Sequence, residues 1–89
     1  MKININGTTH KVFWHHNIGK YFGFNGSTIC KIINKDTNEQ VAIGESFCSD
    51  KDSYNKKVGR KFSLTKAISK FDKSVRASIW DQFKTQIGV

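Results

Sequence analysis

The chain has 89 residues, and its 15 Lys and Arg residues outnumber its seven Asp and Glu residues to give a formal net charge of +8. This length predicts one domain, residues 1–89, with one small core. The apolar fraction of 37% is sufficient for a folded protein. No apolar run approaches the ~18 residues of a membrane span, and no secretory signal begins the chain. We therefore expect a cytoplasmic protein.

The first sixteen residues predict a β-hairpin. Residues 2–6 alternate between apolar and polar side chains, as is typical of a half-buried strand. The Asn-Gly pair at 6–7 favours a type I′ turn, because both central positions of that turn need positive φ. Residues 8–16 form the expected return strand. Phe13 lies on its otherwise polar face, where it would cover a second layer or lie in an exposed site.

Residues 17–27 hold three glycines and predict a loop. The glycine spacing matches neither the P-loop nor the dinucleotide-binding pattern, so a phosphate-cradling loop is not expected. Aromatic residues lie between these glycines, and we expect most of them to pack beneath the sheet. The alternative is that one is exposed as a platform for base stacking. The candidate stacking residues are Tyr21 and Phe22 from this segment, with Tyr54 further along the chain.

Residues 28–35 and 40–48 predict a second hairpin, joined by a turn at residues 36–39. The first segment is rich in β-branched side chains, which favour strands. In the second segment Glu45 interrupts the apolar alternation, and this indicates a bulge near Gly44. The two hairpins together predict one antiparallel sheet of four strands.

The rest of the chain has a helical apolar period. We expect a first helix at residues 55–71 with Ser53 or Asp52 as its N-cap, and a second helix at residues 73–86 capped by Asp72. The expected apolar faces are Val58, Phe62, Leu64, Ile68 and Phe71 in the first helix and Val75, Ile79, Trp80, Phe83 and Ile87 in the second. The predicted fold is α+β, with both helices packed on one face of the sheet.

Gly59 lies inside the first expected helix, where it costs about 1 kcal/mol relative to Ala. A close contact with the sheet would explain this cost, and so would the close approach of a ligand.

The positive charge is concentrated in residues 51–76, which hold nine basic and two acidic side chains and so carry +7 of the total +8. A dense basic surface on helices predicts binding to a polyanion. The alternative is a solvated helix face that keeps the protein in solution. The candidate nucleic-acid-binding residues are Lys56, Lys57, Arg60, Lys61, Lys66, Lys70, Lys73 and Arg76.

The sequence gives little support for catalysis or metal binding. His15 and His16 are adjacent on a strand, so their side chains point to opposite faces and could not easily share one substrate atom. The histidines and cysteines lack metal-ligand spacing, and Cys30 and Cys48 are expected to be free thiols. We therefore expect no enzyme activity, no cofactor and no metal. The enzymatic alternative is a small ribonuclease that uses His15 or His16.

The segment from Cys48 to Phe83 has an acidic and polar turn, a Gly-Arg-Lys helix start and an Arg-x-x-x-Trp second helix. In this pattern, and in its size and basic charge, the chain resembles the small early proteins of T-even bacteriophages, among them the TifA-like proteins that counter the ToxN ribonuclease. The resemblance implies RNA binding and association with a host toxin in an RNA–protein complex. It places the polyanion surface at Lys56, Lys57, Arg60 and Lys61.

The expected function is therefore non-enzymatic binding of nucleic acid, with RNA favoured over DNA, in the cytoplasm of an infected host cell. Its role there would be to counteract a defence or toxin–antitoxin system. The alternative is a protein–protein inhibitor of a host nucleic-acid enzyme that does not itself bind RNA. No membrane partner is expected.

Overall fold

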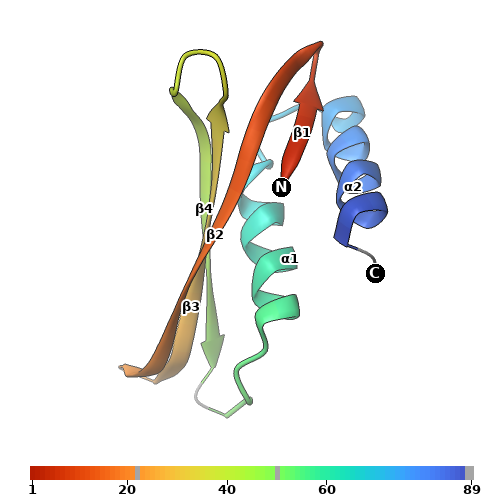
Figure 1. The fold of residues 1–89 in the computed structure, drawn as a ribbon. Helices are drawn as coiled ribbons and strands as arrows, with labels where there is room; N and C mark the ends of the chain where they lie inside the picture. The colour runs from red at the N-terminus through yellow and green to blue at the C-terminus, as the bar shows by residue number, and fades with distance from the viewer. Residues whose placement is uncertain (22, 50, 88–89) are drawn as a thin grey trace.

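A computed structural model of the chain describes residues 1–21, 23–49 and 51–87, with only the backbone described at Lys20 and Tyr21. The elements along the chain are β1 (Lys2–Ile5), β2 (Thr8–Tyr21), β3 (Phe24–Asn34), β4 (Gln40–Ser49), α1 (Lys56–Ala67) and α2 (Lys73–Ile87). The strands form one antiparallel sheet in the order β1-β2-β3-β4. Both helices lie on the same side of this sheet (Figure 1). The predicted α+β architecture is confirmed.

The first hairpin forms as predicted. Ile3 and Ile5 of β1 are buried. The turn residues Asn6 and Gly7 have φ values of 53° and 85°, the positive angles that a type I′ turn requires. The turn closes directly on the pair of Ile5 with Thr8, so its type sets the register of β1 on β2.

Strands β2 and β3 extend further toward each other along the chain than expected, and the prediction of a loop at residues 17–27 was wrong. The strand that was expected to end at residue 16 continues to Tyr21, and Asn17 pairs with Ser27. A side chain at the buried Gly26 would meet the Tyr54 ring at 2.8 Å. The absence of a side chain at Gly26 therefore allows close packing within a strand, and the glycine does not mark a loop.

The predicted bulge near Gly44 was also wrong. The register of β4 on β3 is regular from Ala42 to Cys48, and it shifts between Ile32 and Ile33. Ile32 pairs with Ala42 while Ile33 pairs with Gln40, so the extra residue lies one position before Ala42. Glu45 keeps its place in the alternation and lies on the face away from the helices.

Helix α1 begins and ends inside the predicted range. Its N-cap is Asn55, whose side-chain oxygen accepts hydrogen bonds from the backbone N–H groups of Lys57 at 2.9 Å and Val58 at 3.3 Å. Ser53 and Asp52 were therefore the wrong cap residues. The helix ends at Ala67, and the residue after it has φ −91° and ψ 2°, outside helical geometry. The prediction of a helix to residue 71 was four residues too long.

The face of α1 that packs on the sheet is built from small residues. Ser63, Leu64 and Ala67 are buried, whereas Val58 and Phe62, expected in the core, are 44% and 59% exposed. A side chain at Gly44 would meet backbone atoms of Ser63 and Ala67, and one at Gly59 would meet the Thr28 side chain. The close contact predicted at Gly59 is thus confirmed, and of the expected apolar face Leu64 and Ile68 are buried whereas Val58 and Phe62 are not.

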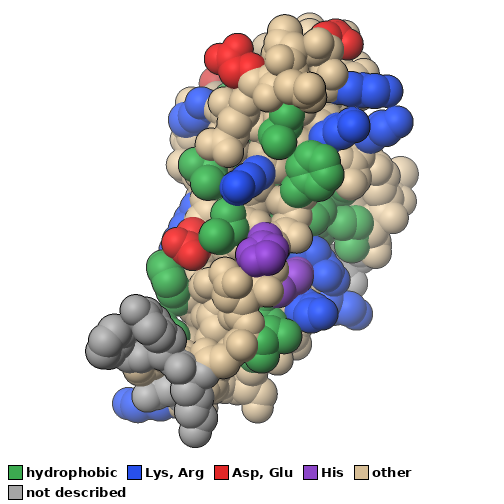
Figure 2. Space-filling view, turned by 60° about the vertical axis from the view of Figure 1, so that its left-hand side comes forward, with side chains coloured by type: hydrophobic (Ala, Val, Ile, Leu, Met, Phe, Trp, Pro, Cys, Tyr) green, Lys and Arg blue, Asp and Glu red, His purple; other side chains and the backbone are tan. Residues whose placement is uncertain are grey.

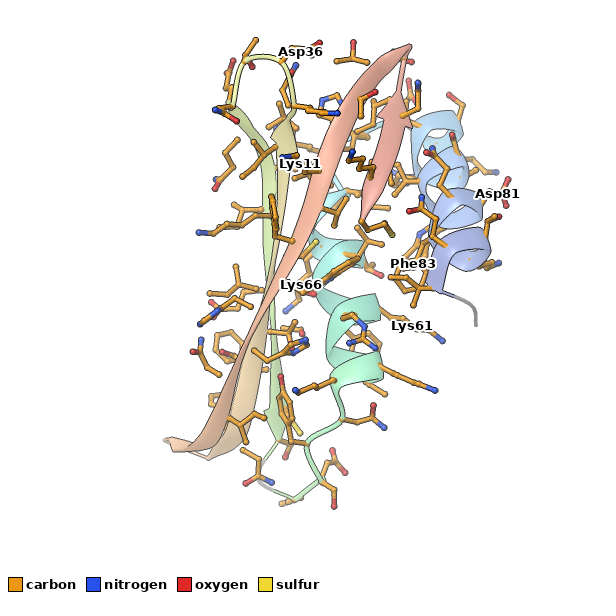
Figure 3. The ribbon with its side chains drawn as sticks, in the orientation of Figure 1. Lys11, Asp36, Lys61, Lys66, Asp81 and Phe83 are labelled. Carbon is orange, nitrogen blue, oxygen red and sulfur yellow. The ribbon has the colours of Figure 1, made fainter. Side chains whose placement is uncertain are left out.

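Helix α2 covers the other half of the sheet. The Asp72 carboxylate accepts a hydrogen bond from the Val75 N–H at 3.0 Å, so the predicted cap is confirmed. Ile79 and Phe83 are buried as expected, and the Phe83 ring meets the Trp14 ring edge-on with centroids 6.0 Å apart. Figure 3 shows Phe83 pointing from α2 toward the sheet.

The two glycine contacts predict that α1 cannot tolerate a larger residue beneath it. Gly44→Ala should lower the free energy of unfolding by about 1–3 kcal/mol, because the new methyl group would push against helix backbone that cannot rotate away. Urea denaturation would measure this change. The control is Gln40→Ala, an exposed position of the same strand. Equal stabilities for the two variants would contradict the close packing of α1.

Candidate nucleic-acid interface

The first two turns of α1 carry four cationic side chains: Lys56, Lys57, Arg60 and Lys61. Lys56 and Lys57 are the first two residues of the helix, and its first turn holds no acidic residue. The positive end of a helix dipole disfavours cations at these positions. Lys56 with Arg60, and Lys57 with Lys61, are also like-charge pairs at i, i+4 spacing, which repel each other. The local sequence thus opposes the stability of its own helix.

No acidic side chain within the described ranges pairs with any of these four cations. The two lysines at the helix start and Lys61 are exposed, and Figure 3 shows Lys61 extending from α1 away from the sheet. Arg60 is half-buried beside β2, and its carbonyl oxygen accepts a hydrogen bond from the Trp14 indole N–H at 3.2 Å. With Trp14, Met1, Gln86 and Ile87, Arg60 lines an open hollow of about 400 Å³.

The pKa of His16 responds to burial and also to the positive charges of this region. Its pKa lies below its usual value of 6.5, first because of partial burial and then because of the nearby charges of Arg60, Lys56 and His15. The two α1 cations therefore act on a side chain of β2, which places strand β2 and helix α1 around one electropositive region. An anion bound there would offset the repulsion between the like-charged pairs of α1 and the unfavourable interaction of its first lysines with the helix dipole.

Tyr54, expected as a possible stacking residue, is held in a hydrogen-bonded cluster. Its hydroxyl oxygen lies 2.8 Å from His16 Nδ1 and 2.8 Å from Thr28 Oγ1, and the hydroxyl donates to the Ser27 carbonyl at 3.1 Å. The ring is half-buried. Tyr54 thus ties the segment before α1 to the sheet and fixes where the helix begins. Of the other two predicted stacking residues, Phe22 and the Tyr21 side chain lie outside the described residues.

The remaining predicted cations lie in two other places. The Lys66 ammonium lies 6.0 Å from the centre of the Phe47 ring, at the β4 edge. Lys70 lies 5.7 Å from the Phe71 ring, while Arg76 donates to the Phe71 carbonyl oxygen at 2.9 Å. Lys73 begins α2 beside them. The eight predicted residues are therefore divided among the start of α1, the β4 edge and the turn between the helices.

His15 and His16 point to opposite faces of β2, as expected for adjacent residues of a strand, and neither cysteine forms a disulfide. His15 is exposed and its Nε2 donates to Asn17 Oδ1 at 3.1 Å, whereas His16 faces the helices. Cys30 and Cys48 are free thiols, and burial raises the pKa of Cys30 to about 12. The described residues include no group of three or more His, Cys, Asp and Glu side chains placed to hold a metal ion.

The sequence interpretation missed large apolar side chains on the sheet face opposite the helices. Phe13, Ile43 and Phe47 are each about half exposed there, and Phe24 is 39% exposed. Two patterns in the sequence pointed to this face: Phe13 broke the polar alternation of its strand, and Ile43 and Phe47 alternated on one face of theirs.

No family model, curated protein or solved structure matches this chain. Among the described residues, neither helix has the length and apolar character needed to cross a membrane.

The lowered His16 pKa predicts a pH dependence of stability. Between the lowered pKa and the usual value, the unfolded chain binds more protons at this residue than the folded chain does, so stability should rise with pH through that window. Arg60→Gln should raise the pKa of His16, as measured by an NMR titration of its imidazole protons. Lys84→Gln, which removes an equal charge from α2, should leave it unchanged. Equal titration of His16 in all three proteins would contradict the electropositive region.

Proposed function

We propose that the protein binds RNA without enzymatic activity, and that the start of α1 holds the phosphate groups. The observation that carries this proposal is that Lys56, Lys57, Arg60 and Lys61 stand at the positive end of a helix with no acidic partner in the described residues. Bound phosphates would offset the like-charge repulsion and the dipole, and would release counterions. RNA is preferred to DNA on the resemblance to the phage proteins.

The proposed setting is the cytoplasm of a host cell, where binding would counteract a defence or toxin–antitoxin system. The feature that supports it is the resemblance of residues 48–83 to the small basic early proteins of T-even bacteriophages. The partner would then be a host toxin bound to RNA, which presents the polyanion that the α1 cations suit.

A second candidate function is inhibition of a host nucleic-acid enzyme through protein–protein contact. The observation that favours it is a cavity of about 360 Å³ between α1 and the β4 edge. Val58, Phe62 and Phe47 line it, and each is exposed by 44% or more. Exposed apolar side chains that gather at one groove are typical of a protein-binding surface.

Salt dependence of RNA binding tests the first proposal. The logarithm of the affinity should fall with the logarithm of salt concentration, with a slope of roughly −0.7 per phosphate neutralised on a single strand. Lys57→Ala combined with Arg60→Ala should weaken binding to all sequences about equally and make the slope shallower by about one unit. Lys57 is exposed, so its loss should change the free energy of unfolding by no more than ~0.5 kcal/mol. Arg60 is half-buried, so its loss also removes packing, and urea denaturation should confirm that the double variant remains folded.

The matched control is Lys70→Ala combined with Lys73→Ala, which removes the same charge from the turn between the helices. This control should bind RNA nearly as the parent protein does. Equal loss of affinity in both double variants would show that binding depends on net charge and not on the start of α1. A parent complex that persists at high salt and after nuclease treatment would instead favour protein–protein inhibition.

A further inference from the structure

The sheet face away from the helices is a second exposed surface, separate from the start of α1. Both helices lie on the opposite side, and no element among the described residues covers this one (Figure 1). Figure 2 shows hydrophobic side chains lying between Lys, Arg and His side chains on the face turned forward. The strand register shows how this mixture is built.

Side chains on this face form rows across the sheet. Phe13 of β2 pairs with Lys31 of β3, and Lys31 pairs with Ile43 of β4. In the next row, His15 pairs with Ile29. Directly opposite side chains in an antiparallel sheet start about 5 Å apart at their Cβ atoms, so the Lys31 side chain leaves the sheet beside that of Phe13. Phe13 and His15 follow each other on one face of β2, roughly 7 Å apart.

The face is also rich in positive charge. Lys2 pairs with Lys11, the residue two before Phe13 on β2. The pKa of Lys2 is lowered, chiefly by the hydrogen bond and charge of Lys35 and then by burial and the charge of Lys11. With Lys31, four lysines therefore lie on this face, and the register places Lys11 and Lys31 nearest to Phe13. Glu45 is the acidic residue that the register places on the same face of β4.

The combination of exposed apolar rings with lysines on this face favours some binding partners over others. A second copy of the chain would bring another +8 charge against the same lysines, which disfavours a dimer through this surface. Single-stranded RNA offers both complementary chemistries: unpaired bases stack on exposed rings, and phosphates neutralise the lysines beside them. A duplex keeps its bases stacked internally and offers only phosphates.

We propose that this face binds the bases of single-stranded RNA, with Phe13 as the stacking platform and Lys11 and Lys31 on the flanking phosphates. The proposal rests on the RNA binding proposed above and deepens it, because it names single strands as the preferred form. His15 lies next in line on β2 to receive the neighbouring base. The α1 cations then supply affinity of the sequence-independent kind, and the sheet supplies the preference for unpaired bases.

The test compares three substitutions at Phe13 with one at Ile43, using a single-stranded oligouridylate of about twelve nucleotides, within the range that such surfaces cover. Phe13→Ala and Phe13→Leu should weaken binding by about 5- to 150-fold, the usual loss for one stacked base, while Phe13→Trp should retain affinity. Ile43→Ala removes a similarly exposed apolar side chain from the same row and should have little effect. The salt slope should be the same in all four variants.

Binding to duplex RNA and the oligomeric state complete the test. Phe13→Ala should leave duplex affinity unchanged, and sedimentation should show a monomer for parent and variant alike. The proposal is overturned if Phe13→Ala binds the single strand like the parent, if Ile43→Ala loses as much as Phe13→Ala, or if the face proves to be buried in a dimer. In the first two cases the α1 double variant still shows its salt effect, so the proposed function stands. A parent protein without salt-dependent RNA binding would overturn both.

Discussion

The close approach of α1 to the sheet is the constraint on which the rest of the structure depends. Gly44 and Gly59 leave no room for a side chain between helix and strands, so the helix packs through Ser63 and Ala67. A helix held this near cannot bury Phe62 on its flank, and the apolar groove at the β4 edge is the result. The same approach fixes the rotation of α1, and with it the direction in which its cations point.

With this rotation of α1, the helix side of the molecule and the outer face of the sheet carry different kinds of side chain. The start of α1 is electropositive, and it acts on His16 across the gap to β2. The opposite sheet face mixes apolar and cationic side chains, as in the pair of Phe13 with Lys31. The core residues that the structure describes lie between the sheet and the helices, and Phe13, Ile43 and Phe47 on the outer sheet face remain about half exposed.

The sequence predicted those features that depend on local chemistry. The Asn-Gly turn at residues 6–7 and the Asp72 cap each follow from one or two residues, and both are present. The apolar face of α1 was mispredicted because a helical period shows which side chains align, while the side that packs is decided by small residues on a distant strand, here Gly44. The α1 cations were found from charge density alone. Their separation from Lys66 and Arg76 depends on the helix turn, which charge density does not show.

Glutamine side chains of α2 occupy hydrogen-bonding groups along β1, the edge strand of the sheet. The Gln82 side chain donates to the Asn4 carbonyl at 2.9 Å and accepts from the Asn4 N–H at 2.7 Å, and Gln86 donates to the Lys2 carbonyl. Amide side chains thus occupy backbone groups that a neighbouring strand would need, so β1 is closed to further pairing. Within the described residues, no helix side chain is hydrogen-bonded to the backbone of β4, the other edge of the sheet. Because a sheet with one occupied edge cannot extend in both directions, edge-to-edge pairing of copies of this chain could not continue into an open-ended fibre.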